Sequence, residues 1–383
     1  MTEPPGRIGV AVDQLGGGGA QRSATLVASR LHELGVQTTL LSGLGGTYAS
    51  DLPEQLPVHV LAPHWPRPRG IASFILGLCR QTRRNRIDVL FASGFAVGRI
   101  ALLLRVTSPV GVWRKTRVVV VEQNTLSLAV QDRFPSHLVR RMILGLTRWL
   151  YRRADAIVGV SDGVSRDLEE TLGLPPGEVI TIFNPVDADR IGEAISGTVA
   201  GDLEATFGAL QRPVVITAGR LVEQKAHRDL IDSFSRLPDN QRGSLVILGE
   251  GPLEAELRMQ AEVLGVNGRL WMPGFVKNPW WFIARSDVFA LSSHWEGHPL
   301  VLLEALKCGV PVVSTDCPSG PREILRGVAH ARLIPLGDLE AFAVAMSELL
   351  HQTSTDAERD EVAFSVQAVA LRYRELSETV RCR

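Results

Sequence analysis

Cysteine is scarce in this sequence, and long apolar runs are absent from it. The 383 residues include four cysteines, none in a C-x-x-C pair or at a zinc-like spacing from histidine. We therefore expect reduced thiols in a cytoplasmic protein. No apolar run approaches the ~18 residues of a membrane-spanning helix. Met1–Pro5 lead straight into an expected strand, so we expect no signal peptide.

The chain also lacks net charge, but its charges are unevenly distributed. Up to Phe183 it has 21 Lys and Arg against 14 Asp and Glu, and the rest has 20 against 27. A basic first half favours an anionic partner or surface, with ordinary scatter as the alternative. We expect no nucleic-acid partner. The length and the 45% of hydrophobic residues predict two domains with their own cores.

A glycine-rich turn follows the first expected strand. Arg7–Val12 is apolar, Gly16–Gly19 comes next, and a helix is expected from about Ala20 to Leu34. A dinucleotide site is the obvious alternative, but Gln21 stands where the third glycine of G-x-G-x-x-G belongs. Side-chain-free residues before a helix allow close approach of a phosphate, or they simply form a tight turn.

Helices and strands continue to alternate, which predicts parallel sheets. Val118–Val121 has no polar alternation and suits a central strand covered on both faces. Ligands bind beyond the carboxyl ends of such strands, where Asn124 lies. Asn124 cannot act as a general base, so we expect it either to orient hydroxyl groups or to form a plain turn.

The segment Arg140–Arg153 predicts a helix with one cationic and one apolar face. Such a helix suits the surface of an anionic membrane, with its Trp and Tyr at the boundary. An ordinary domain helix, with its apolar face in the core and its arginines in solvent, fits equally well. The sequence leaves both interpretations open.

The most informative stretch is 290–325. A strand is expected to end near Ser292, a loop to span Ser293–His298, and Pro299 and Gly309 to bracket a helix over Leu300–Lys307. The helix is apolar nearly all round, so Glu304 would be buried and would need hydrogen-bond donors. The first amides of this helix, Leu300 to Leu302, would face the loop and suit a phosphate. These features predict a nucleotide-sugar pocket.

Glu296 and Glu304 are separated by seven residues, and Ser314–Cys317 and Ser319–Leu325 follow them. This block resembles the E-x7-E signature of retaining glycosyltransferase family 4, in the bacterial branch that builds capsule, lipopolysaccharide and lipid-linked oligosaccharides. That branch usually has Phe where this chain has His298, so the donor-side wall is expected to differ.

The resemblance implies the GT-B fold, an α/β architecture of two Rossmann-like, doubly wound parallel-sheet domains facing across a cleft. Residues 1–184 would bind the acceptor and 185–355 the nucleotide sugar, and the helix within 356–383 would cross back to the first domain. Thr181–Asp187 resembles the interdomain crossover. The D-x-D of Asp187–Asp189 follows this linker and not a strand end, so we do not interpret it as a metal site.

The resemblance also assigns roles. Arg220 and Lys225 would hold the donor diphosphate, Glu296 hydroxyls of the donor sugar and Glu304 the ribose. The candidate site residues are catalytic Glu296, Arg220, Lys225 and Asn124; donor-binding Glu304, Gly219, Gly251, Phe275, Val276, Gly297, His298, Pro299, Leu300 and Val301; and an acceptor or phosphate loop of Gly18, Gly19, Gln21 and Arg22.

Together these features predict a retaining glycosyltransferase that needs no cofactor and no metal. It would move a hexose or N-acetylhexosamine from a UDP-sugar to a glycan acceptor, expected to be lipid-linked, in bacterial surface polysaccharide assembly. The enzyme would be cytoplasmic, with peripheral contact to the inner face of the membrane through Arg140–Arg153. A UDP-sugar epimerase of the same fold and a transferase acting on a small-molecule natural product are the alternatives.

Overall fold

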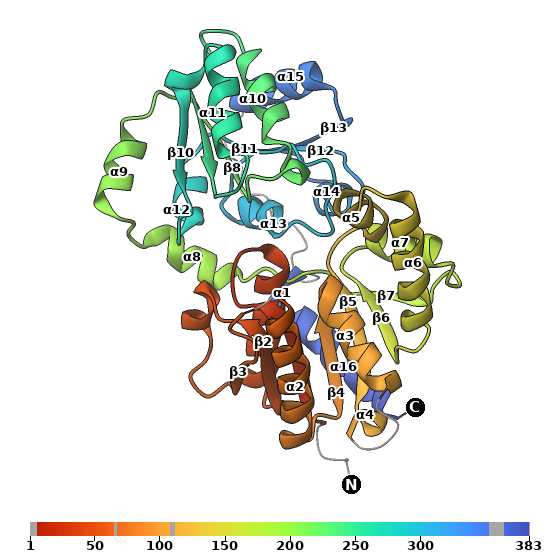
Figure 1. Ribbon diagram of the computed structural model, residues 1–383. Helices are drawn as coiled ribbons and strands as arrows, with labels where there is room; N and C mark the ends of the chain where they lie inside the picture. Colours follow the sequence, from red (N-terminus) through yellow and green to blue (C-terminus); the bar gives the residue numbers. More distant parts are fainter. Residues whose placement is uncertain (1–5, 65–66, 108–111, 352–363, 383) are drawn as a thin grey trace. The chain divides into compact units, whose positions relative to one another are not determined.

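The computed structural model describes residues 6–64, 67–107, 112–351 and 364–382. The chain divides into two compact units (Figure 1). Unit 1 comprises Met1–Pro185 together with Val362–Arg383, and unit 2 comprises Val186–Glu361. The division after Pro185 lies one residue from the boundary that the sequence predicts.

Unit 1 is built on a parallel sheet in the order β3-β2-β1-β4-β5-β6-β7. Its strands are β1 Ile8–Gln14, β2 Thr38–Leu44, β3 Val58–Val60, β4 Val89–Ser93, β5 Arg117–Glu122, β6 Ala156–Gly159 and β7 Val179–Thr181. The four valines of β5 are all buried, as expected for a strand covered on both faces.

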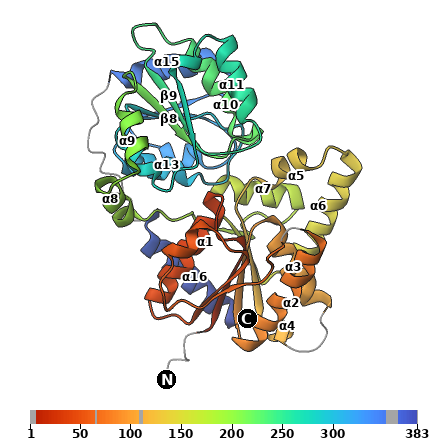
Figure 2. The same ribbon diagram turned by 60° about the vertical axis from the view of Figure 1, so that its left-hand side comes forward.

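Helices cover both faces of this sheet (Figure 2). They are α1 Gly19–Glu33, α2 Pro68–Arg84, α3 Phe95–Thr107, α4 Val112–Lys115, α5 Leu126–Arg133, α6 His137–Tyr151, α7 Asp162–Leu172 and α16 Val366–Arg381. The last helix packs beside α1, where Arg30 Nε donates to Gln367 Oε1 at 2.5 Å. Tyr373 of α16 meets Phe91 of β4 edge to face, with ring centroids 5.0 Å apart. The C-terminal helix is therefore part of the core of unit 1.

Unit 2 holds a second parallel sheet, in the order β10-β9-β8-β11-β12-β13. The strands are β8 Val214–Ala218, β9 Ser244–Leu248, β10 Leu270–Gly274, β11 Val288–Leu291, β12 Val312–Thr315 and β13 Ala331–Ile334. The helices are α8 Ala188–Ser196, α9 Gly201–Gly208, α10 His227–Ser235, α11 Glu254–Val263, α12 Pro279–Ile283, α13 Leu300–Lys307, α14 Pro321–Leu325 and α15 Leu339–Leu350. From β8 the chain first builds outward to one side and then, from β11, to the other. The carboxyl ends of β8 and β11 thus form a topological switch point, where ligands bind in such sheets.

The predicted class of fold, two doubly wound α/β units, is confirmed. The predicted helix over Leu300–Lys307 has the same bounds as α13, and Gly309 after it is left-handed with φ of 73°. The final helix, expected within 356–383, begins at Val366, because Ser365 Oγ accepts a hydrogen bond from the Ala368 amide and caps it there. Residues 356–363 lie outside the described residues.

Two absences concern the described part of the chain only. No helix in it has both the length and the hydropathy that a bilayer crossing requires. No three His, Cys, Asp or Glu side chains within the described ranges are grouped to hold a metal ion. Asp187, from the D-x-D sequence, caps α8 by accepting a hydrogen bond from the Arg190 amide at 3.2 Å.

Candidate functional site

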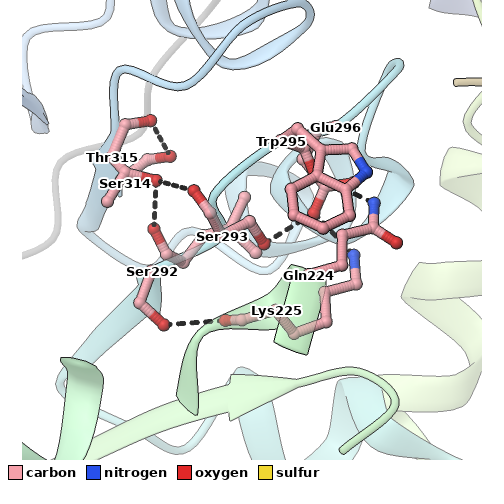
Figure 3. Close-up of polar contacts among 9 residues, drawn as sticks. Gln224, Lys225, Ser292, Ser293, Trp295, Glu296, Ser314 and Thr315 are labelled. Atoms are coloured by element: carbon pink, nitrogen blue, oxygen red, sulfur yellow. Dashed lines mark hydrogen bonds and ion pairs between the residues drawn. The ribbon is translucent and has the colours of Figure 1, made fainter. Parts of the chain in front are cut away.

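A cluster of polar contacts in unit 2 lies at the carboxyl ends of β8 and β11 (Figure 3). Two loops meet there, 219–226 after β8 and 292–299 after β11. Lys225 Nζ donates to Glu296 Oε1 at 2.6 Å, and Ser293 Oγ donates to the same oxygen at 2.7 Å. The Lys225 side chain is 16% exposed and that of Glu296 6%, so the pair is largely shielded from water. A carboxylate this deep is stable because both donors compensate for its lost hydration.

Further hydrogen bonds join the two loops, two of them between a side chain and a backbone carbonyl and one between backbone groups. Gln224 Nε2 donates to Trp295 O at 2.9 Å, and the His294 amide donates to Gln224 O at the same distance. Ser292 Oγ donates to Lys225 O at 3.0 Å. These contacts fix the lysine and the glutamate relative to each other before any ligand binds (Figure 3).

The strand next to β11 supports the same loop. Thr315 Oγ1, at the end of β12, donates to Ser293 O at 2.6 Å (Figure 3). Gly320 then brings a second loop against the first. A Cβ at Gly320 would lie 2.6 Å from Pro299 Cδ and 2.8 Å from Gly297 O, and its φ of 93° favours glycine. The 317–320 loop therefore packs directly on the loop that carries Glu296.

Arg220 differs from Lys225 although both are predicted to hold phosphate. Its side chain is exposed, and no ion pair within the described residues involves it. Gly219 lies beside the lysine, since a Cβ there would stand 3.5 Å from Lys225 Cε. The edge thus offers one cation held in place by a carboxylate and one that is open to solvent.

Helix α13 follows the Glu296 loop directly. Leu300 and Glu304 are buried in it, and Val301 is half-buried. One expectation is wrong: the Leu302 amide donates to Pro299 O at 3.1 Å, because the first turn closes on its own backbone. The predicted anion-facing helix end rests on Leu300 and Val301.

His298 is buried beside Gly297 at the end of this loop. Burial lowers the pKa of its imidazole to about 3, so the ring is neutral at physiological pH. A neutral imidazole thus stands where the branch that the sequence resembles usually has Phe.

His227, buried at the start of α10, was not among the predicted residues. Burial, and then the charge of Lys225, lowers its pKa to about 4. Its position two residues after Lys225 is the feature of the sequence that could have indicated it.

The remaining donor candidates lie along the same edge of the sheet. A Cβ on Gly251 would stand 2.3 Å from Leu221 O, so this glycine serves the close packing of two loops. Phe275 is 52% exposed, and its amide donates to Glu250 Oε1 at 3.3 Å. Val276 is buried. Phe275 and Val276, predicted to bind the donor, thus follow the end of β10, and the Phe275 amide is already hydrogen-bonded.

The acceptor-loop candidates are gathered at the start of α1 in unit 1. Gly18 caps the helix and Gly19 begins it. Gln21 Nε2 donates to Asp13 Oδ1 at 2.9 Å, which ties the helix start to the end of β1. Arg22 follows, half-buried. Asn124, also half-buried, comes after β5 and lies at the same carboxyl edge, two strands away from β1 in the sheet.

Glu122 at the end of β5 belongs to a cluster that the sequence did not predict. It is buried, Arg99 Nη1 donates to its Oε1 at 3.2 Å, and Tyr151 OH donates to the same oxygen. Burial raises the pKa of the Tyr151 hydroxyl well above its usual value. The cluster joins β5 to α3 and α6, and we interpret it as structural because a tyrosine and two helices close it off.

Two family models match the chain in succession. The model described as Glycosyltransferase Family 4 matches residues 17–190, and the one described as Glycosyl transferases group 1 matches residues 204–364.

Similar curated proteins include bacterial glycosyltransferases. The N-acetylgalactosamine-N,N'-diacetylbacillosaminyl-diphospho-undecaprenol 4-alpha-N-acetylgalactosaminyltransferase of Campylobacter jejuni is 30% identical over 325 residues, covering 83% of each chain. The lipopolysaccharide 1,6-galactosyltransferase of Escherichia coli is 27% identical over 201 residues, covering 51% of this chain and 53% of that protein.

Solved structures of the same fold cover nearly the whole chain. Anabaena HepE in complex with UDP superposes with a TM-score of 0.70 at 19% identity, covering 98% of this chain and 97% of that one. The sucrose-phosphate synthase of Thermosynechococcus elongatus gives a TM-score of 0.77 at 15% identity, with 98% and 99% covered.

Proposed function

Because the chain belongs to glycosyltransferase family 4 and has its GT-B fold, we propose that it moves a hexose or N-acetylhexosamine from a UDP-sugar to a lipid-linked glycan. The observation that carries the proposal is the bonded pair of Lys225 and Glu296 at the switch point of unit 2, with Arg220 open beside it. A cation for a diphosphate and an acceptor for sugar hydroxyls, side by side, suit the two halves of a nucleotide sugar.

The donor's leaving group is a diphosphate, whose charge rises as the glycosidic bond breaks. Arg220 can bind two phosphate oxygens at once, and Lys225 adds a compact point charge. The lysine ammonium has three donors, so it can keep Glu296 and reach a phosphate oxygen with another. These groups stabilise the departing UDP without a metal.

Transfer then proceeds with retention at the anomeric carbon. Glu296 binds hydroxyls of the donor sugar through its carboxylate and Glu304 binds the ribose, so neither acts as the nucleophile. The acceptor hydroxyl attacks from the face that UDP leaves, and the departing phosphate takes its proton. Asn124 and the loop Gly18–Arg22 of unit 1 orient the acceptor.

The relatives support the choice of substrates. UDP and UDP-glucose are bound in crystal structures of HepE, a protein of the same fold. The Campylobacter relative transfers N-acetylgalactosamine to a glycan on diphospho-undecaprenol, in the words of its name. A lipid-linked acceptor sets the reaction at the inner face of the cytoplasmic membrane, in the assembly of a surface polysaccharide.

The test begins with thermal shifts of the purified chain in the presence of UDP-, GDP- and ADP-sugars, with EDTA added. Stabilisation by one UDP-sugar is the expected result, and stabilisation by none of the UDP-sugars contradicts the proposal. Turnover is then measured with an undecaprenyl-diphosphate-linked glycan, and the anomer of the product is assigned by proton coupling constants. An inverted anomer rules out retention, and turnover abolished by EDTA rules out metal independence.

A small-molecule acceptor is the second candidate. It is favoured by the N-acetyl-alpha-D-glucosaminyl L-malate synthase of Bacillus anthracis, which is 25% identical over 223 residues. Transfer to a water-soluble acceptor, with none to the lipid-linked glycan, identifies this case. Conversion of the UDP-sugar with no acceptor present identifies an epimerase instead.

A further inference from the structure

Helix α6 of unit 1 exposes a continuous apolar stripe. Leu138 is 69% exposed, Met142 66%, Leu146 51% and Trp149 42%. Residues at this spacing lie on one side of a helix. Large apolar side chains in such a row are unusual on a soluble surface and indicate a binding surface.

These side chains are not the ones that hold the helix in place. The opposite side of α6 carries Thr147, Leu150 and Tyr151, which are buried. Thr147 Oγ1 accepts a hydrogen bond from Arg99 Nε at 3.0 Å, and Tyr151 OH donates to Glu122. The core face of α6 is therefore accounted for, as an ordinary domain helix requires, and the exposed stripe is a second apolar face outside the core.

A row of cations borders the stripe. Arg141, Arg148 and Arg152 are exposed along its flank, and Arg153 stacks on the Trp149 ring with its guanidinium carbon 3.9 Å from the centroid. None of these four arginines forms an ion pair within the described residues. The sequence from His137 to Arg153 contains no Asp or Glu. The exposed face of α6 is thus both apolar and positive, and the helix lies at the periphery of unit 1 (Figure 2).

We propose that this face of α6 lies on an anionic lipid bilayer, with the apolar stripe among the acyl chains and the arginines on the lipid phosphates. An amphipathic helix with a cationic flank binds such a surface through burial of its apolar side chains and through electrostatic attraction to the lipid phosphates. A protein partner or a second copy of the chain would not require uncompensated cations beside the apolar row. The proposal deepens the proposed function and rests on it for the lipid-linked acceptor, which lies in the same surface.

The buried face of α6 connects the proposed membrane contact to the predicted acceptor residues of unit 1. Tyr151 and Arg99 connect the helix to Glu122, two residues before Asn124 at the carboxyl end of β5. A membrane-bound α6 therefore holds the acceptor edge of unit 1 in a defined position relative to the bilayer.

The experiment is sedimentation of the full chain with vesicles, without donor or acceptor. Equimolar phosphatidylglycerol and phosphatidylcholine vesicles are compared with vesicles of phosphatidylcholine alone. We expect binding to the anionic vesicles and at least about tenfold weaker binding to the neutral ones. Each Arg→Gln change at positions 141, 148 and 152 should weaken anionic binding by roughly fivefold.

The decisive variant is Leu138→Glu with Met142→Glu, for which we expect loss of vesicle binding. The matched control is Met259→Glu with Val263→Glu on α11 of unit 2, two apolar residues that are also exposed, at 59% and 81%. The control should bind as the unchanged protein does. Circular dichroism and the UDP-sugar thermal shift should be the same for all of them.

Three results overturn the proposal. They are no binding of the unchanged chain to anionic vesicles, equal loss in the stripe and control variants, and an oligomer in solution that the stripe variant dissociates. The first two leave the transferase intact when donor binding and turnover persist. An inactive protein that still binds vesicles contradicts the proposed function alone.

Discussion

A buried glutamate stands at the carboxyl edge of each sheet, and the two are held differently. In unit 1, Glu122 is bonded to Arg99 and Tyr151, which belong to the helices α3 and α6. In unit 2, Glu296 is bonded to Lys225 and Ser293, which belong to the loops after β8 and β11. The first carboxylate connects elements of a core, and the second lies between loops at a switch point.

Burial and ion pairing are common to both carboxylates and therefore do not by themselves assign a role to either. Both glutamates are less than a tenth exposed, and each accepts hydrogen bonds from a cation and a hydroxyl. What separates them is where the partners come from. Partners on packed helices fix a position, whereas partners on switch-point loops also face the place where a ligand binds.

The largest effect should come from the two cations of unit 2. Lys225→Ala and Arg220→Ala should each lower kcat by about 10² to 10³, because charge on the departing diphosphate is no longer compensated. Only Lys225→Ala should also reduce the free energy of unfolding, by about 3 kcal/mol, since it leaves Glu296 buried without its cation. Steady-state kinetics and urea denaturation measure both quantities. Near-normal turnover of both variants would rule out the assigned roles.

Substituting each of the two glutamates in turn tests whether one is structural and the other functional. Glu122→Ala should lower the free energy of unfolding by about 3 kcal/mol, because Arg99 loses its buried partner, and should leave the Kd for the UDP-sugar unchanged. Glu296→Gln keeps the shape and a hydrogen-bond acceptor, so it should cost less stability and more activity. Urea denaturation gives the free energy of unfolding of each variant, and titration calorimetry gives its Kd for the UDP-sugar. A large change of Kd in Glu122→Ala would contradict the structural role.

Acid should lower the free energy of unfolding through the buried histidines of unit 2. The pKa of His298 is about 3 in the folded chain, against an ordinary histidine value of 6.5. Between these values the unfolded chain binds the extra proton, so stability falls as pH drops below about 6.5, by up to roughly 1.4 kcal/mol per pH unit. His298→Phe should flatten this dependence, and His227 should account for part of what remains. Urea denaturation from neutral to mildly acidic pH is the measurement, and an unchanged slope in His298→Phe would refute the assignment.

The smallest effect is expected at Ala226, between Lys225 and α10. Its φ of 47° is left-handed, which costs a residue with a Cβ about 1 kcal/mol. Ala226→Gly removes that cost but adds freedom to the unfolded chain, so we expect a gain in stability of between zero and about 1 kcal/mol. Arg86→Gly, at a φ of 48° in unit 1, is the matched control and should behave alike. A fall in stability for Ala226→Gly alone would indicate a contact of its methyl group.

Much of the fold could be read from the sequence because it depends on local patterns. The all-valine strand β5, the Pro299 and Gly309 boundaries of α13 and the glycine turn before α1 each have a short-range signal. The donor-site residues were predicted for a similar reason, since their spacing resembles that of a known family. The Glu122 cluster was missed because its members, Arg99 and Tyr151, are distant from it in the chain. His227 was missed because its burial is set by tertiary packing.

The orientation of a helix face shows the same limit. The sequence predicted equally that the apolar face of α6 packs in a core or that it lies on a surface. Only the packed structure shows that Tyr151 and Thr147 point inward, so that Leu138 and Met142 point outward.

By itself, the sequence determined the order of strands and helices, the class of fold and the residues to examine. These follow from periodicity, backbone preference and a motif, all of which act over a few residues. The tertiary structure decided which charges pair: that Lys225 is bound to Glu296 while Arg220 is open to solvent, and that Glu122 serves the core. Pairing depends on distances between segments far apart in the chain, and only the packing of the sheet and its loops sets those distances.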